Sequence, residues 1–260
     1  MILCIDVGNT NIKYGVFEGD RLIVSFRVAT DLKRTSDQYG TALIDMFAVK
    51  GIKPGDIVGA IVSSVVPPLN YTITHMCTGY LGVEPLVVGA GLKTGHNLRV
   101  DDAREVGADR IVNDVAAIKK YGAPLIVIDF GTATTFNVIN ENKEFIGGAV
   151  APGMRGSMDS LVSGTAKLPR VEIETPKSVI GKNTTTNLQA GLVFGFAGLV
   201  DYIVRRTKKE MKRPDMKVVA TGGFSEIIAK EVACIDYVDK LLTLNGLKIL
   251  YDLNRSEDKK

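Results

Sequence analysis

A short motif occurs twice in this chain, roughly a domain's length apart, with the same order of residue types in each copy. Four apolar residues lead into an acid, which is followed by one apolar residue, a glycine and several small polar residues; the acids are Asp6 and Asp129. A second apolar strand pattern follows each copy. A repeat of this length is typical of two similar α/β halves rather than of a solenoid. The sequence therefore predicts a duplicated α/β fold, with domains at residues 1–118 and 119–260.

Hydrophobic period and turn residues predict the remaining elements. Strands are expected at residues 2–5, 12–17, 21–29, 60–66, 85–88, 125–129, 134–139, 145–150 and 217–220. Helices are expected at residues 36–50, 67–81, 109–120, 187–208, 225–232 and 241–253, with Ser36 as the N-cap of the first. A glycine-rich connection is expected at residues 152–156, and a frayed polar tail at residues 256–260.

Composition excludes several classes of protein. Hydrophobic residues make up 45% of the chain and charged residues 23%, as in ordinary folded proteins. The formal net charge of +3 is small and evenly spread, which argues against a nucleic-acid partner. The chain shows neither a signal-peptide pattern nor an uninterrupted apolar stretch of roughly 20 residues. We expect a soluble cytoplasmic protein that makes no membrane contact.

The cysteines and histidines give no metal or redox motif. Cys4, Cys77 and Cys234 lie far apart, so we expect reduced, buried thiols. His75 and His96 have no acidic partners at ligand spacing; the first is expected on a helix and the second in a loop.

The turn at residues 6–13 has the features of a phosphate-binding loop. Its glycine and small polar residues expose backbone N–H groups and hydroxyls together, as a phosphate chain requires. Asp6 would hold Mg²⁺ directly or through water, because Mg²⁺ prefers a few carboxylates together with waters and phosphates. An ordinary hairpin turn containing asparagine is the alternative for this segment alone. The matching turn at residues 129–135 favours the nucleotide site.

Other nucleotide signatures are weak or fail. Residues 218–224 run from a strand through two glycines into a helix, which suits an adenosine contact but is also a common connection. Residues 181–184 resemble a P-loop lysine, but Pro176 stands where that loop needs its first glycine. Residues 89–91 lack the third glycine of a dinucleotide fingerprint.

Residues 107–110, with the sequence Gly-Ala-Asp-Arg, are the candidate catalytic segment. Phosphoryl transfer to an alcohol needs a carboxylate that accepts the hydroxyl proton and a cation that orients the substrate. Asp109 and Arg110 supply both. The alternative is an N-cap aspartate followed by a surface arginine.

Seven motifs spread over nearly the whole chain resemble those of the type III pantothenate kinases, the actin-like class of pantothenate kinase. They are DVGNTN at 6–11, GADR at 107–110, DFGTATT at 129–135, GGAVAPG at 147–153, LPRVEI at 168–173, GKNTTT at 181–186 and ATGGF at 220–224. The resemblance implies two ribonuclease-H-like (actin-like ATPase) domains with a nucleotide cleft, a homodimer, and phosphorylation of pantothenate by ATP in coenzyme A biosynthesis.

The resemblance also implies a set of site residues. It implies ATP contacts at Asp6, Val7, Gly8, Asn9, Thr10, Asn11, Ile12, Lys13 and Thr132, and pantothenate contacts at Val100, Gly107, Ala108, Asp109, Arg110 and Thr184. Asp109 is expected to be the general base. Asp129 is expected to be associated with the monovalent cation, K⁺ or NH₄⁺, that this class requires.

One position departs from the family pattern, and two other functions are open. Similar family members often have a tyrosine in the pantothenate pocket where this chain has Val100, which bears on substrate affinity. Relatives were first described as accessory regulators of transcription, so a non-enzymatic role is one alternative. A kinase for another hydroxylated metabolite, such as a sugar, is the other; the GADR and LPRVEI segments argue against it.

Overall fold

The structure, a computed structural model, describes residues 1–255, and the tail expected to fray lies outside the described residues. The chain forms two compact units. The first unit contains residues 1–95 and 102–116 together with the C-terminal helix α7 (Leu242–Arg255), and the second contains residues 96–101 and 117–241. The division expected from the sequence differs in one main respect, because α7 returns to the first unit.

The first unit is built on a mixed five-stranded sheet of order β3-β2-β1-β4-β5. Its strands are β1 (Ile2–Val7), β2 (Asn11–Glu18), β3 (Arg21–Ala29), β4 (Gly59–Ser64) and β5 (Leu86–Val87). The first three form an antiparallel meander, and β4 and β5 continue the sheet parallel to β1. Both faces of β1 are buried, as expected for its continuous apolar run.

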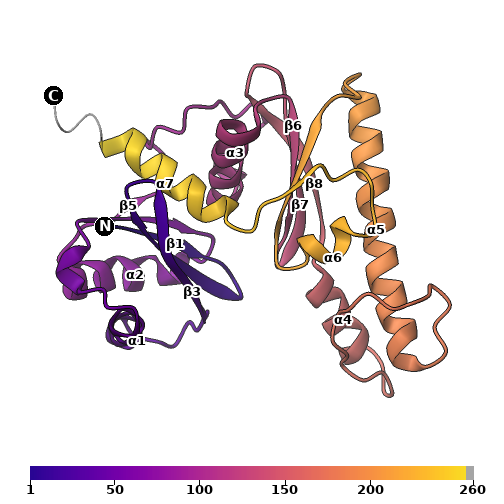
Figure 1. The fold of residues 1–260 in the computed structure, drawn as a ribbon, viewed down its shortest axis with the longest axis horizontal. Helices are drawn as coiled ribbons and strands as arrows, with labels where there is room; N and C mark the ends of the chain where they lie inside the picture. Colours follow the sequence, from indigo (N-terminus) through magenta and orange to yellow (C-terminus); the bar gives the residue numbers. More distant parts are fainter. Residues whose placement is uncertain (256–260) are drawn as a thin grey trace. The chain divides into compact units, whose positions relative to one another are not determined.

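Helices cover both faces of this sheet. They are α1 (Ser36–Val49), α2 (Asn70–Met76) with a π-helical turn at Cys77–Leu81, α3 (Ala108–Tyr121) and α7. One core joins the sheet to α1 and α2, and a second joins the opposite face to α3 and α7. Figure 1 shows α7, in yellow, beside the indigo strands of the N-terminal sheet.

The first helix is capped one residue earlier than expected. The Thr35 side chain accepts a hydrogen bond from the Gln38 backbone N–H at 3.3 Å, and the Gln38 side chain accepts one from the Thr35 N–H at 3.0 Å. This reciprocal capping box satisfies two backbone donors. Ser36 is therefore the first helical residue and not the cap.

The second unit repeats the topology of the first. Its sheet has the order β10-β9-β6-β7-β8, with strands β6 (Leu125–Phe130), β7 (Ala133–Ile139), β8 (Phe145–Pro152), β9 (Lys217–Gly222) and β10 (Tyr237–Val238). The antiparallel meander β6-β7-β8 and the parallel β9 and β10 match β1 to β5 in sequence order. Asp6 and Asp129 each occupy the fifth position of the central strand. The predicted fold class is confirmed.

The helices of the second unit differ from expectation in two places. They are α4 (Met154–Ser163), α5 (Thr184–Glu210) and α6 (Ser225–Ala229). Helix α4 was not predicted, because its glycine and serines are poor helix formers. It forms because Met154 and Met158 are buried on one face of it. The short strand β10 was also missed, and α6 ends sooner than its pattern indicated.

Helix α5 is the longest in the part of the chain that the structure describes. It has 27 residues, and an 18-residue window within it has a mean hydropathy of 1.4, enough by length and composition alone to cross a membrane. The core helix of a soluble protein has the same properties. Val193, Val200 and Val204 on α5 are fully buried against the second unit's sheet. Figure 1 shows α5 lying along that sheet.

Candidate active site

The turn between β1 and β2 is fixed by hydrogen bonds from its own backbone and from the end of β3. The Gly8 N–H donates to the Asn11 carbonyl at 3.1 Å. The Thr30 hydroxyl donates to the Gly8 carbonyl at 2.6 Å, and the Thr30 N–H donates to the Thr10 carbonyl at 3.0 Å. Asn9 and Thr10 at the tip are exposed. The result is a hydrogen-bonded polar turn with its tip open to solvent.

Asp6 lies at the base of this turn, facing Lys13 across the hairpin. The two residues are register partners in β1 and β2, and Lys13 Nζ is 3.3 Å from Asp6 Oδ2. The Asp6 side chain is 9% exposed and the Lys13 side chain 40%. Burial raises the pKa of Asp6, the Lys13 charge opposes this shift, and the Asp109 charge adds to it. A buried carboxyl thus stands beside one ammonium group and near a second carboxyl.

The start of α3 presents Asp109 and Arg110. The Gly107 carbonyl accepts from the N–H groups of Arg110, at 3.0 Å, and Ile111, at 3.3 Å. Asp109 Oδ1 accepts from the Arg110 N–H at 2.8 Å. The helix begins at Ala108, so Asp109 lies inside the first turn and not at the N-cap position that the structural alternative required.

The electrostatic environment of Asp109 links it to the β1–β2 turn. Burial raises the pKa of Asp109, while a hydrogen bond from the Arg110 backbone and the charges of Arg110 and Lys13 oppose the shift. The charge of Lys13 therefore lowers the pKa of both Asp6 and Asp109. A β-carbon at Gly107 would come within 2.6 Å of Asp109 Oδ1, so a larger residue here would displace the Asp109 carboxylate. The first unit thus brings together two motifs that are distant in the sequence.

The second unit places a glycine pair around Asp129. Gly222 has a φ of +91°, and a β-carbon there would come within 2.6 Å of both Asp129 Oδ1 and the Phe130 carbonyl oxygen. Gly131 N–H donates to the Ala133 carbonyl at 3.1 Å, and Thr132 at the tip of this turn is exposed. Gly222 at the end of β9 therefore lies beside Asp129, a neighbourhood that the sequence did not reveal.

Thr184 is the first residue of α5 and is exposed. Asn183 caps the helix by accepting from the Thr186 N–H at 2.9 Å. Gly181 packs close to the next turn, where a β-carbon would meet the Asn187 side chain at 2.2 Å. The GKNTTT motif thus folds as a helix start, and Thr184 has no part in the capping box.

Val100 follows a segment that is anchored to the start of β8. The Phe145 N–H donates to the Asn97 carbonyl at 2.9 Å, and the Arg99 N–H donates to the Phe145 carbonyl at 2.7 Å. Arg99 Nε also donates to Glu144 Oε1 at 2.8 Å. Backbone pairing and an ion pair therefore hold the residues just before Val100 in place.

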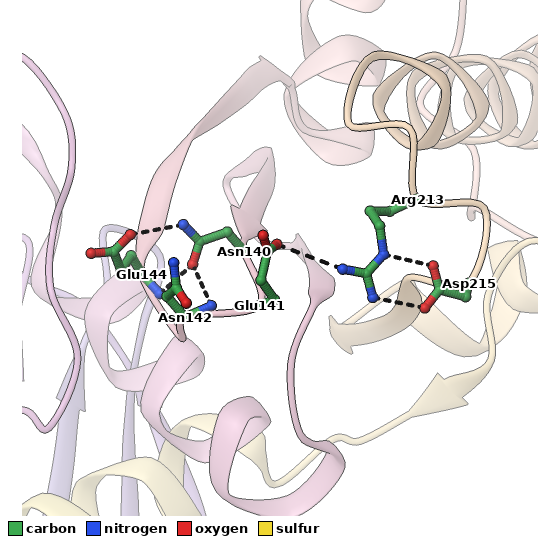
Figure 2. Close-up of polar contacts among 6 residues, drawn as sticks. All are labelled: Asn140, Glu141, Asn142, Glu144, Arg213 and Asp215. Atoms are coloured by element: carbon green, nitrogen blue, oxygen red, sulfur yellow. Dashed lines mark hydrogen bonds and ion pairs between the residues drawn. The ribbon is translucent and has the colours of Figure 1, made fainter.

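Glu144 is itself oriented by the turn between β7 and β8. Asn140 Nδ2 donates to Glu144 Oε2 at 2.8 Å, and Asn140 Oδ1 accepts from the Glu144 N–H at 2.9 Å. Figure 2 shows the hydrogen bond between Asn140 and Glu144. It also shows Arg213, which forms ion pairs with both Glu141 and Asp215. The hydrogen bond from Asn140, and then Arg99, lower the pKa of Glu144. Sequence reasoning missed Glu144 and Arg99, because no local pattern pairs them.

Two sheets of one topology, each with an acid as the penultimate residue of its central strand and a glycine turn after it, define an actin-like ATPase fold. Among solved structures, a conserved putative Baf family transcriptional activator from Campylobacter jejuni matches with a TM-score of 0.62 and 18% identity, over 98% of this chain and 99% of that one. A putative 2-dehydro-3-deoxygalactonokinase from Sinorhizobium meliloti matches with a TM-score of 0.64 and 11% identity, over 97% and 96%. Likeness at this level of identity is evidence of the fold alone.

Sequence comparison gives the family. Residues 2–206 match the family model for type III pantothenate kinase. A type III pantothenate kinase from Bacillus cytotoxicus is 50% identical over 254 residues, which are 98% of this chain and 97% of that protein. This chain belongs to the type III pantothenate kinase family.

Proposed function

We propose that this chain transfers the terminal phosphoryl group of ATP to the primary hydroxyl of pantothenate, giving 4'-phosphopantothenate in the first committed step to coenzyme A. Membership of the family supports this activity. The structural observation that supports this activity is the cluster of Asp6, Lys13 and Asp109 in the first unit. Lys13 pairs with Asp6, and its charge lowers the pKa of both carboxyls.

Each member of the cluster has a chemical task in this proposal. Asp109 accepts the proton of the attacking hydroxyl, and its raised pKa suits a base that works near neutral pH. Arg110 orients the anionic substrate, and Lys13 offsets charge on the phosphates. The backbone of the β1–β2 turn, from Asp6 to Lys13, cradles the phosphate chain. Thr132 contacts ATP, and Gly107, Ala108, Val100 and Thr184 contact pantothenate.

The residues present fit the two cations that the reaction needs. Asp6 offers one buried carboxylate beside the turn, which suits Mg²⁺ when phosphates and waters complete its shell. At Asp129 a carboxylate oxygen and the Phe130 carbonyl oxygen both lie within 2.6 Å of the point where a β-carbon of Gly222 would stand, so two hard oxygen donors of the kind that suits K⁺ or NH₄⁺ lie close together. The Phe130 carbonyl also accepts from the Gly223 N–H at 3.2 Å. Bound there, the cations would supply positive charge to the phosphates.

We further propose a cytoplasmic homodimer without a nucleic-acid or membrane partner. The second unit has apolar side chains in solvent, with Val150 64% and Tyr202 58% exposed. Tyr202 also lines a groove of about 300 Å³ formed by residues of β7, β8 and α5. Exposed apolar surface of this kind is common at protein interfaces and favours self-association. The small net charge of +3 gives no support to nucleic-acid binding.

An ADP-release assay tests the proposed activity. Pantothenate and several sugars are offered separately with ATP, Mg²⁺ and K⁺, and we expect turnover with pantothenate only. Turnover on a sugar in place of pantothenate would make the chain a sugar kinase. No turnover on any acceptor would favour the regulatory role over the enzyme.

A further inference from the structure

Ser63 on β4 has a buried hydroxyl with no hydrogen-bond partner among residues 1–255. The residue is 0% exposed. Burying a hydroxyl without a partner costs about 1–3 kcal/mol, so a buried alanine would be cheaper at this position. Unpaired buried groups are rare in native proteins and commonly mark a site where a ligand, a water or a catalytic group supplies the missing bond.

The sheet places Ser63 directly beside Asp6. The two residues are register partners in the parallel pair β1 and β4. Cys4 and Ile61, two residues earlier on each strand, pack on the face covered by α3 and α7. Because side chains alternate along a strand, Asp6 and Ser63 point to that same face. Neighbouring strands are about 4.8 Å apart, so the Ser63 hydroxyl can reach the carboxylate through one water, or directly after a change of side-chain rotamer.

The internal repeat places a hydroxyl residue at the same position in the second unit. Asp129 on β6 is the register partner of Thr221 on β9, just as Asp6 on β1 is the partner of Ser63 on β4. Thr221 is 2% exposed. Each central acid therefore has a small, buried hydroxyl residue on the neighbouring parallel strand, although the two segments differ in sequence around it.

We propose that Ser63 is a positioning residue: when the Mg²⁺-nucleotide is bound, its hydroxyl donates a hydrogen bond, directly or through one water, to the Asp6 carboxylate and fixes the orientation of that carboxylate toward the Mg²⁺-nucleotide. Lys13 holds Oδ2 of that carboxylate from one side, and Ser63 lies on the opposite neighbouring strand. The two residues together would set the carboxylate plane. This inference rests on the proposed function, since it assumes that Asp6 serves a magnesium nucleotide.

The substitution Ser63→Ala separates this role from a structural one. We expect an unchanged or higher melting temperature for the variant without ligand, because the hydroxyl has no bond to lose. The Kd for ATP with Mg²⁺ should rise about tenfold, the value of one hydrogen bond to a charged group. The Kd measured in EDTA should change far less. Ser63→Thr should restore the wild-type Kd, because it keeps the hydroxyl that Thr221 carries in the repeat.

Ser64→Ala is the matched control. The Ser64 hydroxyl oxygen accepts from the Val66 N–H at 3.1 Å, and the residue adjoins Ser63 on the opposite face of the strand. We expect this variant to melt earlier and to keep its Mg²⁺-dependent affinity. Equal nucleotide affinity for wild type and Ser63→Ala, with or without a change in melting temperature, would overturn the inference. A wild-type chain that binds no nucleotide would instead refute the proposed function, and the inference with it.

Discussion

Replacing Asp109 with asparagine tests the proposed base with little structural disturbance. Asparagine keeps the shape of the side chain, and its Oδ1 can still accept the Arg110 N–H that lies 2.8 Å from Asp109 Oδ1. The lost features are the proton acceptor and the negative charge. Loss of a general base lowers turnover by about 10²- to 10⁴-fold, which corresponds to about 2.7 to 5.4 kcal/mol in the barrier.

Nucleotide binding should survive this change. Asp6 and Lys13 keep their ion pair, and the variant loses the charge that disfavours ionisation of Asp6. We expect a nearly unchanged Kd for Mg²⁺-ATP by calorimetry beside the large fall in kcat by ADP release. Asp45→Asn, an exposed change on α1, is the matched control and should keep both values. Near-normal turnover in Asp109→Asn would refute the reasoning.

The pH dependence supplies a second readout for the same variant. Burial raises the pKa of Asp109 above the usual 3.8, so the acid limb of wild-type kcat/KM should lie above that value. A carboxyl whose pKa is higher in the folded state than in the unfolded state stabilises the folded protein. This stabilisation is fully present below the unfolded-state pKa, and it is lost as the pH rises through the folded-state pKa. Melting temperature should therefore fall less with rising pH in Asp109→Asn than in the wild type. Parallel curves would contradict the burial argument.

Three further predictions concern the second unit. Activity should depend on K⁺ or NH₄⁺ because of the donors around Asp129, and equal rates in matched potassium and sodium buffers would exclude this. Val100→Tyr should lower the KM for pantothenate by restoring the family's aromatic residue; an unchanged or higher KM would show that this position does not limit binding. Glu144→Gln should raise the KM for pantothenate with little change in the Kd of ATP, because it weakens the ion pair to Arg99 that holds the segment before Val100. The Arg99 side chain is 69% exposed, so the effect on melting temperature should be small. A KM equal to that of the wild type would argue against an anchoring role.

The duplicated architecture could be predicted because its signals are local. An apolar run that ends in an acid and a glycine indicates a strand and a turn without any tertiary information, and two such runs gave both central strands. The boundaries of β3 and the start of β8 followed from the same pattern. The grouping of Asp6 with Asp109 was reached only through family resemblance, since their electrostatic interaction depends on how α3 packs on the sheet.

Features that depend on distant partners could not be predicted. Helix α4 forms because Met154 and Met158 are buried, although its glycine and serines oppose a helix. Ser63 looks like any polar residue at the end of an apolar run until the register with Asp6 is known. The ion pair between Arg99 and Glu144 joins two segments with no shared pattern. In each case the sequence does not show which distant residues lie next to the side chain in the folded protein.

The return of α7 to the N-terminal sheet has a consequence for how the protein is made. Leu247 and Leu250 on α7 are fully buried in one core with Cys4 and Ile61. The first sheet therefore has α3 but not α7 on that face until residues 242–255 are synthesised. At roughly 5–20 residues per second, the wait is on the order of ten seconds. A nascent chain of this design must remain unaggregated while that apolar face is only partly covered, and a nonsense mutation before residue 242 would leave it partly uncovered permanently.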